Sequence, residues 1–360
     1  MRYCHFCGNP LEERLEVFRA TLCTSCNKDL RICRNCRFYS PGAHWDCRES
    51  ISEPVYEKER SNFCDFFNFT ESVQKKPLEK KQGNNARRIL TTSLIMACKP
   101  VIFFDSGIGG LPYLEMARQR VAGELFIYLA DRKHFPYGVK RPSEVLAGVM
   151  ESMGLAIRRF DPRAVVVACN TASVIALAQL RKRYDIPFIG VVPAVKPAAR
   201  SLPAGRLAVL ATERTLADNY LADLIRNFAE GCEVIRYPLG KLVNLVEYDY
   251  FSTSAAEKRA IVSREIGDLK NSAVSSAVLG CTHFILLEEE LKSAMGGGVD
   301  IVDSREGVTR QLIRVLKDKG SGEGCPGGRD CFYVTGEAPV EERYRKFAGK
   351  YGLEFAGILK

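Results

Sequence analysis

From Val101 onward, short apolar runs alternate with longer amphipathic stretches. The apolar runs have the length of strands and read VIFFD, LFIYLAD, AVVVACN, PFIGVV, RLAVLAT, EVIRY, SAVLGC, VDIVDS and CFYVTG. Most are separated by helical patterns such as PSEVLAGVMESMGLAIRRF. Strands that are apolar throughout and alternate with helices are typical of parallel sheets covered on both faces. The pattern predicts an α/β fold, and about nine such units favour two α/β domains over one sheet.

Length and composition are consistent with this interpretation. A chain of 360 residues fits two to three domains, and 46% hydrophobic with 26% charged residues is the balance of a soluble folded protein. No run of about 18 apolar residues occurs, so we expect no membrane-spanning segment. The first residues, MRYCHFC, contain no apolar signal region, so we expect a cytoplasmic protein. The net charge of +9 is mild and does not by itself argue for nucleic acid.

The cysteines are unevenly distributed. Of 14, eight fall in the first 64 residues: Cys4, Cys7, Cys23, Cys26, Cys33, Cys36, Cys47 and Cys64. A secreted disulfide domain could show this density. Three Cys-x-x-Cys pairs and the absent signal region favour a reducing compartment and metal binding instead.

The spacing of these cysteines predicts two zinc sites. The first four cysteines follow a zinc-ribbon spacing, in which Cys4-x-x-Cys7 and Cys23-x-x-Cys26 are separated by fifteen residues. Cys33, Cys36, Cys47 and Cys64 form a second set of four, with His44 as an alternate ligand. Interleaved pairing, free or disulfide-bonded cysteines and an iron–sulfur site remain alternatives.

We interpret residues 1–70 as a cysteine-rich zinc-binding module and 71–98 as a linker. The module has ten basic and ten acidic residues, and two zinc ions held by eight thiolates would make it negative. This makes nucleic acid an unlikely partner and leaves a structural role, partner docking or redox sensing. The linker is polar, with a basic run that also allows contact with RNA or an acidic partner.

In the α/β part, a glycine-rich loop follows the first strand. The loop Asp105-Ser106-Gly107-Ile108-Gly109-Gly110 lacks the third glycine of a dinucleotide loop and the Gly-Lys-Ser/Thr of a P-loop. What remains is a turn that presents Asp105 and Ser106 at the carboxyl end of a strand, where open α/β sheets bind ligands. A purely structural turn is the alternative.

Two cysteines occupy equivalent positions. Cys169 and Cys281 each follow an apolar strand, precede a polar residue and open a helical pattern. A helix N-terminus lowers the pKa of a thiol and makes it a better base or nucleophile. Either cysteine alone could be buried and inert. Two in equivalent settings, separated by 112 residues, predict a cleft with one thiol on each wall.

The sequence resembles glutamate racemase, of the aspartate/glutamate racemase family. The resemblance covers residues 100–318 through FFDSGIGGLPYLEMA, DRKHFPYG, VVVACNTAS, IPFIGVVPAVKPA, ATERT, LGCTHFILL and IVDS, in the order of the family. It implies two pseudo-symmetric α/β domains with the active site between them, formed by residues 99–193 with 300–360 and by residues 194–299. It also implies cofactor-independent interconversion of L- and D-glutamate for peptidoglycan, without pyridoxal phosphate.

The resemblance also implies roles for individual residues. Cys169 and Cys281 would be the two bases. The substrate would be held by Asp105, Ser106, Tyr137, Gly138, Asn170, Thr171, Thr282 and His283. Asp131 and Glu247 match acidic positions near the site of the family.

The match has departures and leaves alternatives. Asp131 is followed by Arg-Lys-His, and CEVIRYPLG replaces the usual sequence before Glu247, which bears on specificity more than on chemistry. The cysteine-rich module has no counterpart in typical members, and its partner is not indicated. The alternatives are an aspartate or other amino-acid racemase, and a zinc-dependent regulatory protein whose racemase-like part is inactive. A homodimer is compatible with the sequence.

Overall fold

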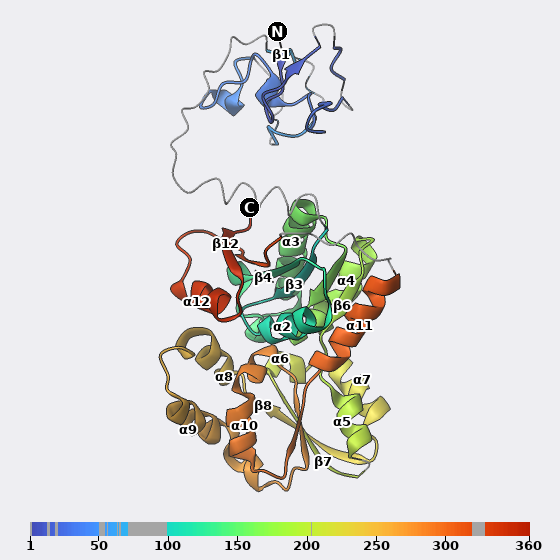
Figure 1. Cartoon of the computed structure of the whole chain (residues 1–360), viewed down its shortest axis with the longest axis vertical. Coiled ribbons are helices and arrows are strands. Elements are labelled where there is room, and N and C mark those ends of the chain that lie inside the picture. Colours follow the sequence, from blue (N-terminus) through green and yellow to red (C-terminus); the bar gives the residue numbers. More distant parts are fainter. Residues whose placement is uncertain are drawn as a thin grey trace. The chain divides into compact units, whose positions relative to one another are not determined.

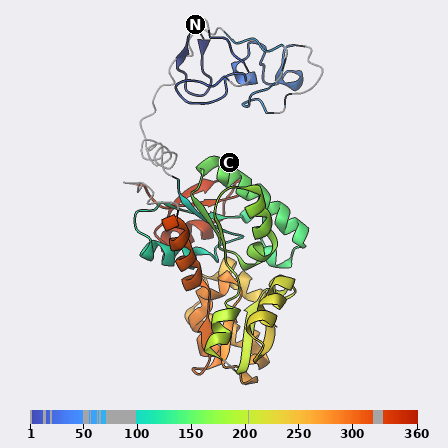
Figure 2. The same ribbon diagram turned by 90° about the vertical axis from the view of Figure 1, so that its right-hand side faces the viewer.

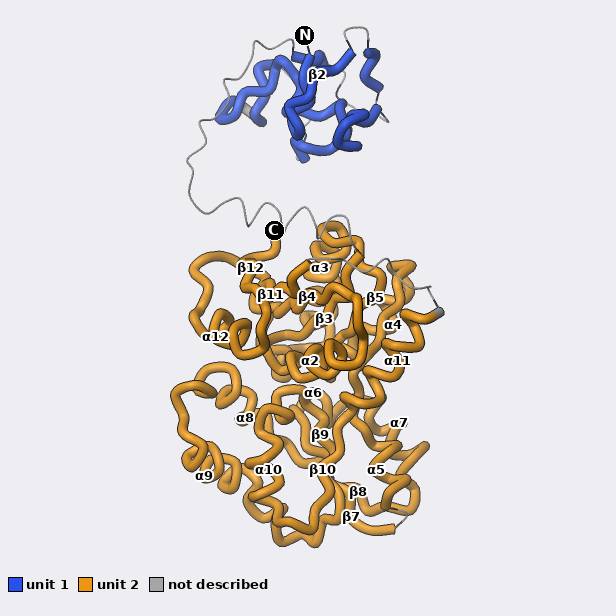
Figure 3. Tube along the Cα trace, in the orientation of Figure 1, with its two compact units in different colours: residues 1–83 blue, residues 84–360 orange. Residues whose placement is uncertain are grey.

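The computed structural model describes residues 2–12, 15–18, 21–49, 55, 57–62, 64, 66–70, 99–202, 204–318 and 328–360. The chain forms two compact units, Met1–Gly83 and Asn84–Lys360 (Figure 3). The predicted linker over 71–98 lies outside the described residues. Among the helices within the described ranges, none is long and apolar enough to cross a membrane.

The larger unit contains a six-stranded parallel sheet with the order β12-β11-β4-β3-β5-β6 (Figure 1). Its strands are β3 (Val101–Asp105), β4 (Phe126–Ala130), β5 (Ala164–Val167), β6 (Phe188–Gly190), β11 (Cys331–Val334) and β12 (Glu354–Ile358). Helices α2 (Leu111–Arg120) and α11 (Arg305–Asp318) pack together on one face. Helix α12 (Glu342–Lys350) packs against the same core. Helices α3 (Pro142–Phe160) and α4 (Asn170–Arg183) cover the other face.

The packing of β3 explains why its sequence is apolar throughout. Val101 and Phe103 belong to the core beneath α2 and α11, whereas Ile102 and Phe104 belong to the core beneath α3 and α4. Successive side chains of a strand point to opposite faces, and here both faces are covered. Figure 2 shows from the side that helices flank the sheets of the larger unit on both faces.

The second sheet is four-stranded and parallel, with the order β10-β9-β7-β8. Its strands are β7 (Gly205–Ala211), β8 (Cys232–Pro238), β9 (Ser276–Leu279) and β10 (Asp300–Val302). Its helices are α5 (Val195–Ser201), α6 (Glu213–Leu216), α7 (Asn219–Phe228), α8 (Lys241–Asn244), α9 (Ala255–Ile266) and α10 (Glu288–Met295). Helices α5 and α7 pack on one face, and α9 and α10 on the other.

All nine apolar runs form strands, so the predicted α/β fold of parallel sheets is confirmed. Two details differ from the sequence analysis. The strand β10 pairs with β9, although residues from 300 onward were assigned to the other domain. The strand β12 was not predicted, because its residues EFAGI are all half-buried and include Gly357 at a φ of +95°.

The carboxyl edges of the two sheets meet. Thr282, after β9, donates a hydrogen bond of 2.9 Å to Asp105 at the end of β3. The hydroxyl of Thr171, after β5, lies 3.5 Å from that of Thr212, after β7. Because loops at the carboxyl ends of parallel strands carry the polar side chains of α/β folds, this junction is where a site is expected.

The smaller unit has little regular structure. Strands β1 (Arg2–Tyr3) and β2 (Pro10–Leu11) pair antiparallel, and two single 3-10 turns span Cys33–Asn35 and His44–Asp46. Its described core consists of Cys4, Leu11, Cys23, Leu30 and Phe69. So small a core provides little hydrophobic stabilisation, which is the usual situation in which a metal or disulfides are needed.

Candidate active site and metal centre

A cavity of about 380 Å³ lies where the two carboxyl edges meet. Of the twelve predicted catalytic, substrate-binding and supporting residues, nine line it: Ser106, Tyr137, Gly138, Cys169, Asn170, Thr171, Cys281, Thr282 and His283. A larger hollow of about 900 Å³ lies among β6, α5, α7 and α11, but the described residues that line it include no cysteine or histidine. The smaller cavity holds both thiols and is therefore the candidate active site.

Cys169 stands on one wall of this cavity. It follows β5 and has an extended backbone at the N-terminal end of α4. Its Sγ lies 3.8 Å from the hydroxyl of Ser106. Burial raises the pKa of the Cys169 thiol, and the nearby Asp105 carboxylate raises it further. The lowered pKa expected from the helix N-terminus is not found here, because desolvation of the thiolate outweighs the helix end.

Cys281 stands on the other wall, after β9, and its backbone is extended in the same way. Its Sγ lies 3.7 Å from Nδ1 of His283. Burial alone lowers the pKa of His283, but hydrogen bonds to Cys281 and Glu247 and their negative charges raise it well above its ordinary value. The direction of this shift favours the protonated form of His283.

Glu247 lies behind His283 and connects distant segments. It is buried in a single turn of π-helix, Leu245–Asp249. Its Oε1 accepts hydrogen bonds from Nε2 of His283 at 2.7 Å and from the backbone N–H of Ile108 at 2.8 Å. Its Oε2 lies 3.6 Å from Nε of Arg343 on α12. Glu247 does not line the cavity, so it acts on the site through His283.

The glycines of the first loop allow these side chains to approach the backbone. A Cβ added at Gly107 would lie 1.7 Å from Oε1 of Glu247. A Cβ added at Gly109 would lie 2.6 Å from both Nδ1 of His283 and Oγ1 of Thr282. The loop is therefore glycine-rich because side chains from the other sheet pack against it, not because it cradles a phosphate.

Asp105 connects the loops that form the two walls of the cavity. It is fully buried, and its Oδ1 accepts a hydrogen bond of 2.8 Å from the backbone N–H of Gly107, while Oδ2 accepts one of 2.9 Å from Thr282. Burial raises the pKa of Asp105. Asp105 is absent from the cavity lining, so its contacts hold the loops and do not reach the cavity.

Asp131 is a second buried carboxylate that holds a cavity residue, Tyr137, in place. Its carboxylate accepts hydrogen bonds from Tyr137, from Ser152 at 2.9 Å and from Thr335 at 2.6 Å. Nδ1 of His134 lies 3.0 Å away, and this contact with Asp131 raises the pKa of His134. Asp131 does not line the cavity either, and it fixes the position of the tyrosine that does.

Asn170 offers unused hydrogen-bonding capacity. Both polar atoms of its buried side-chain amide lack a partner within the described parts of the chain, and the residue lines the cavity. Buried polar groups are nearly always paired, so an unpaired amide in a cavity indicates a ligand. Thr171, by contrast, is engaged with the hydroxyls of Thr212 and Thr215, at 3.5 and 3.2 Å.

Comparison with known proteins identifies the family. The model of Asp/Glu/Hydantoin racemases matches residues 113–312. This chain belongs to that racemase family. A glutamate racemase of Treponema pallidum is 35% identical over 259 residues, which cover 71% of this chain and 95% of that protein. One of Sphingopyxis alaskensis is 38% identical over 220 residues, covering 60% and 81%.

Solved structures agree with this assignment. The Escherichia coli glutamate racemase in complex with L-glutamate and the activator UDP-MurNAc-ala has a TM-score of 0.66 and 30% identity, over 72% of this chain and 97% of that one. The RacE1 isoform of Bacillus anthracis has a TM-score of 0.61 and 27% identity, over 72% and 96%. The resemblance inferred from the motifs is confirmed, and with it the assignment as an amino-acid racemase, an isomerase.

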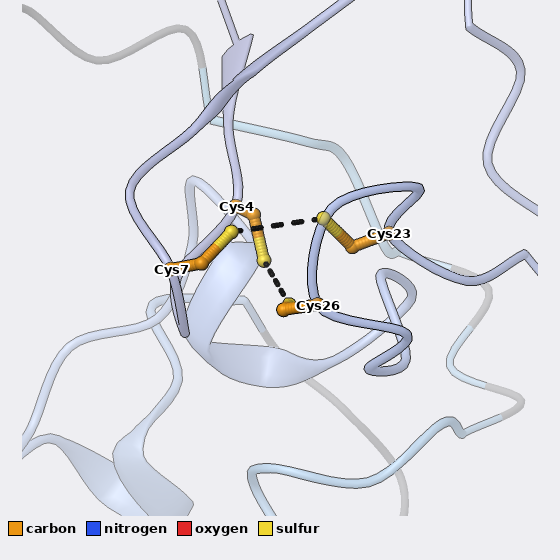
Figure 4. Close-up of side chains that lie close together, drawn as sticks. All are labelled: Cys4, Cys7, Cys23 and Cys26. Atoms are coloured by element: carbon orange, nitrogen blue, oxygen red, sulfur yellow. Dashed lines mark hydrogen bonds between the residues drawn. The ribbon is translucent and has the colours of Figure 1, made fainter. Parts of the chain in front are cut away.

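The first four cysteines of the smaller unit converge (Figure 4). The sulfurs of Cys4, Cys7, Cys23 and Cys26 all lie within 4.8 Å of one another. Cys4 and Cys26 are 3.7 Å apart, as are Cys7 and Cys23. Four thiolates at about 2.3 Å from a zinc ion lie roughly 3.8 Å apart, so these residues fit a tetrahedral site.

The two Cys-x-x-Cys turns have the same backbone design. The N–H of Cys4 donates to the carbonyl of Asn9 at 3.0 Å, and that of Cys23 to Lys28 at 2.8 Å, five residues on in each case. The residue after each second cysteine, Gly8 or Asn27, has a left-handed backbone. Glycine and asparagine are the residues that adopt it at least cost.

The second set of cysteines is less compact. Cys33, Cys36, Cys47 and Cys64 line one small cavity of about 20 Å³. No three of their sulfurs lie within 4.8 Å of one another in the described structure. The side chain of His44, the alternate ligand, lies outside the described residues.

Proposed function

We propose that this chain interconverts L- and D-glutamate by proton transfer between Cys169 and Cys281, without a cofactor, and so supplies D-glutamate for peptidoglycan. The observation that carries the proposal is that the two thiols follow equivalent strands of two sheets and line one cavity. The relatives named glutamate racemase support glutamate as the substrate. Free thiols need a reducing compartment, so we place the reaction in the cytoplasm.

Two thiols on opposite walls fit the stereochemistry of the reaction. Inverting the α-carbon requires a proton to leave from one face and another to arrive at the opposite face. One cysteine, as thiolate, removes the α-proton and becomes a thiol. The other, as thiol, donates its proton to the resulting carbanion and becomes a thiolate. The two cysteines have then exchanged states and are ready for the opposite enantiomer.

The α-proton of an amino acid is only weakly acidic, so the intermediate must be stabilised where charge develops. The unpaired amide of Asn170 is a donor for the substrate carboxylate. The hydroxyls of Ser106 and Thr282 line the same cavity. Thr282 donates its one hydroxyl hydrogen to the buried Asp105, so its side chain is fixed before the substrate arrives and offers the substrate a hydrogen-bond acceptor.

The two walls give the cysteines different support. Nδ1 of His283 lies 3.7 Å from Sγ of Cys281, and the raised pKa of His283 favours its protonated form, so it can exchange a proton with that cysteine. The sulfur of Cys169 has the hydroxyl of Ser106 and the backbone N–H of Ala172 nearby, and burial together with Asp105 keeps its pKa high. We therefore expect Cys169 to hold its proton in the free enzyme, so that it donates first.

A coupled assay for D-glutamate with the purified chain tests the proposal. We expect D-glutamate from L-glutamate after dialysis against a chelator and in the presence of hydroxylamine, which traps pyridoxal phosphate. L-Aspartate should react much more slowly. Faster turnover of L-aspartate would assign the enzyme to that substrate, and no turnover of either would favour a regulatory protein with an inactive racemase-like part.

A further inference from the structure

The second set of cysteines in the smaller unit comes from three separate segments. Cys33 and Cys36 flank a 3-10 turn, in which the N–H of Cys36 donates to the carbonyl of Cys33 at 2.9 Å. Cys47 lies opposite Tyr39 in an antiparallel bridge. Cys64 is fixed by Arg31, whose guanidinium donates to its carbonyl at 2.9 Å. The backbone thus brings four thiols to one small cavity.

The surroundings of this cavity suit thiolates. Nδ2 of Asn62 lies 3.6 Å from Sγ of Cys33, and Oδ1 of the same amide accepts a hydrogen bond of 3.1 Å from the N–H of Cys64. The side chain of Lys58 lines the cavity and is held by Asp46 at 3.8 Å and by the carbonyl of Trp45. An N–H donor and a cation next to sulfur are the kind of support that metal-bound thiolates receive.

We propose that the smaller unit binds two zinc ions through thiolates, one at the cluster of Cys4, Cys7, Cys23 and Cys26 and a second at Cys33, Cys36, Cys47 and Cys64. Four sulfur ligands select soft or borderline metals over calcium and magnesium. All four cysteines of the second set are free thiols. Their sulfurs draw together to tetrahedral distances on binding, closing the small cavity. Lys58 offsets part of the negative charge that four thiolates leave around a divalent ion.

One buried side chain connects the two sites. Asn35 lies between Cys33 and Cys36, and its Oδ1 accepts a hydrogen bond of 2.9 Å from the N–H of His5, in the first Cys-x-x-Cys turn. Its Nδ2 donates to the carbonyl of Leu30 at 2.9 Å. Because the core of this unit is small, metal binding supplies much of its folding free energy. The two ions therefore stabilise one fold.

The direct test is the metal content of the full-length chain, purified with reductant and measured by elemental analysis. We expect about two zinc ions per chain, and absorption spectra at the zinc edge should show about four sulfurs per zinc at ~2.3 Å. One zinc per chain would overturn the proposal, as would iron in place of the second zinc or nitrogen and oxygen ligands at half of the sites.

Variants assign the ions to their ligands. Replacing Cys47→Ser and Cys64→Ser together should lower the zinc content from about two to about one, and Cys232→Ser, in the larger unit, should leave it unchanged. Unchanged zinc in the double variant would refute the assignment. If the double variant unfolds and loses both ions, the thiol count of the unreduced, denatured wild type still decides between thiolates and disulfides. All 14 cysteines should react, and a shortfall of two or four would indicate disulfides instead.

Discussion

The two walls of the candidate active site are alike in backbone and unlike in chemistry. Cys169 and Cys281 both follow a buried strand with an extended backbone, φ −141° and −138°, just before a helical turn. Cys169 faces a hydroxyl and a buried carboxylate, whereas Cys281 faces the imidazole of His283, which is hydrogen-bonded to Glu247. Pseudo-symmetry therefore positions the two thiols, and the side chains around each determine how it holds a proton.

Removing either thiol should have the largest effect. Cys169→Ser and Cys281→Ser should each lower kcat for racemisation by roughly three orders of magnitude, because a serine hydroxyl is far less acidic and cannot exchange roles with a thiol. The coupled D-glutamate assay measures this. Each variant should still eliminate the leaving group of a β-substituted analogue whose α-proton faces its remaining thiol. Near-normal racemisation by either variant would contradict a two-thiol mechanism.

Disturbing the support of the Cys281 wall should have a smaller effect. In Gly107→Ala, the new Cβ occupies the place of Oε1 of Glu247, so the carboxylate must move away from His283. We expect kcat to fall about 10- to 100-fold, within the range of general acid–base contributions. The matched control is Gly349→Ala, where a Cβ meets no atom within 4 Å. Equal activity of the two variants would show that the Glu247–His283 contact does not matter.

The pH dependence should reveal the same difference. Because the pKa of His283 is raised, its positive charge persists above the ordinary range of histidine and is lost as the pH rises through the raised pKa. The raised pKa of Cys169 likewise places the loss of its proton on the alkaline side. We expect kcat to fall at alkaline pH. The variant His283→Asn should shift the pH at which this fall occurs.

Enantiomers have equal free energies, so kcat/KM must be the same in both directions at every pH. A chemical difference between the two walls can therefore appear only in the separate values of kcat and KM, and not in their ratio. We expect the two kcat profiles of the wild type to differ. Identical kcat profiles in the two directions would argue that the walls are chemically equivalent.

The smallest effect on catalysis should come from the cysteine-rich unit. The lining residues of the cavity run from Ser106 to His283 within the larger unit, so we expect both walls to stay intact when metal leaves the smaller unit. A strong chelator should release zinc and unfold this unit, seen by proteolysis, and change kcat by less than about twofold, within the effect of a surface change. A large loss of activity would mean that the unit acts on the site.

The sequence predicts best what depends on neighbours along the chain. Apolar runs predict the strands, and polar residues at strand ends predict the cavity lining, because the carboxyl ends of parallel strands share one edge. Contacts across the fold leave no such signal. Thr335 reaches Asp131 from 204 residues away, and Arg343 approaches Glu247 from α12, yet nothing in the sequence pairs either residue with its carboxylate.

The sign of the Cys169 pKa shift shows the same limit. A helix N-terminus is visible in the sequence, and it predicts a lowered pKa. The burial of the thiol and the charge of Asp105 depend on tertiary packing, and they raise the pKa instead.

Deuterium incorporation tests the two-thiol account most directly. In D₂O the chain converts L-glutamate to D-glutamate. At low conversion the two enantiomers are separated, and the deuterium content of each is measured by mass spectrometry. With one thiol on each face, the product receives its α-hydrogen from the second, solvent-exchanged thiol. We predict that D-glutamate carries deuterium from the first turnovers while the remaining L-glutamate keeps its protium. Deuterium entering both enantiomers equally, or protium retained in the product, would contradict the account.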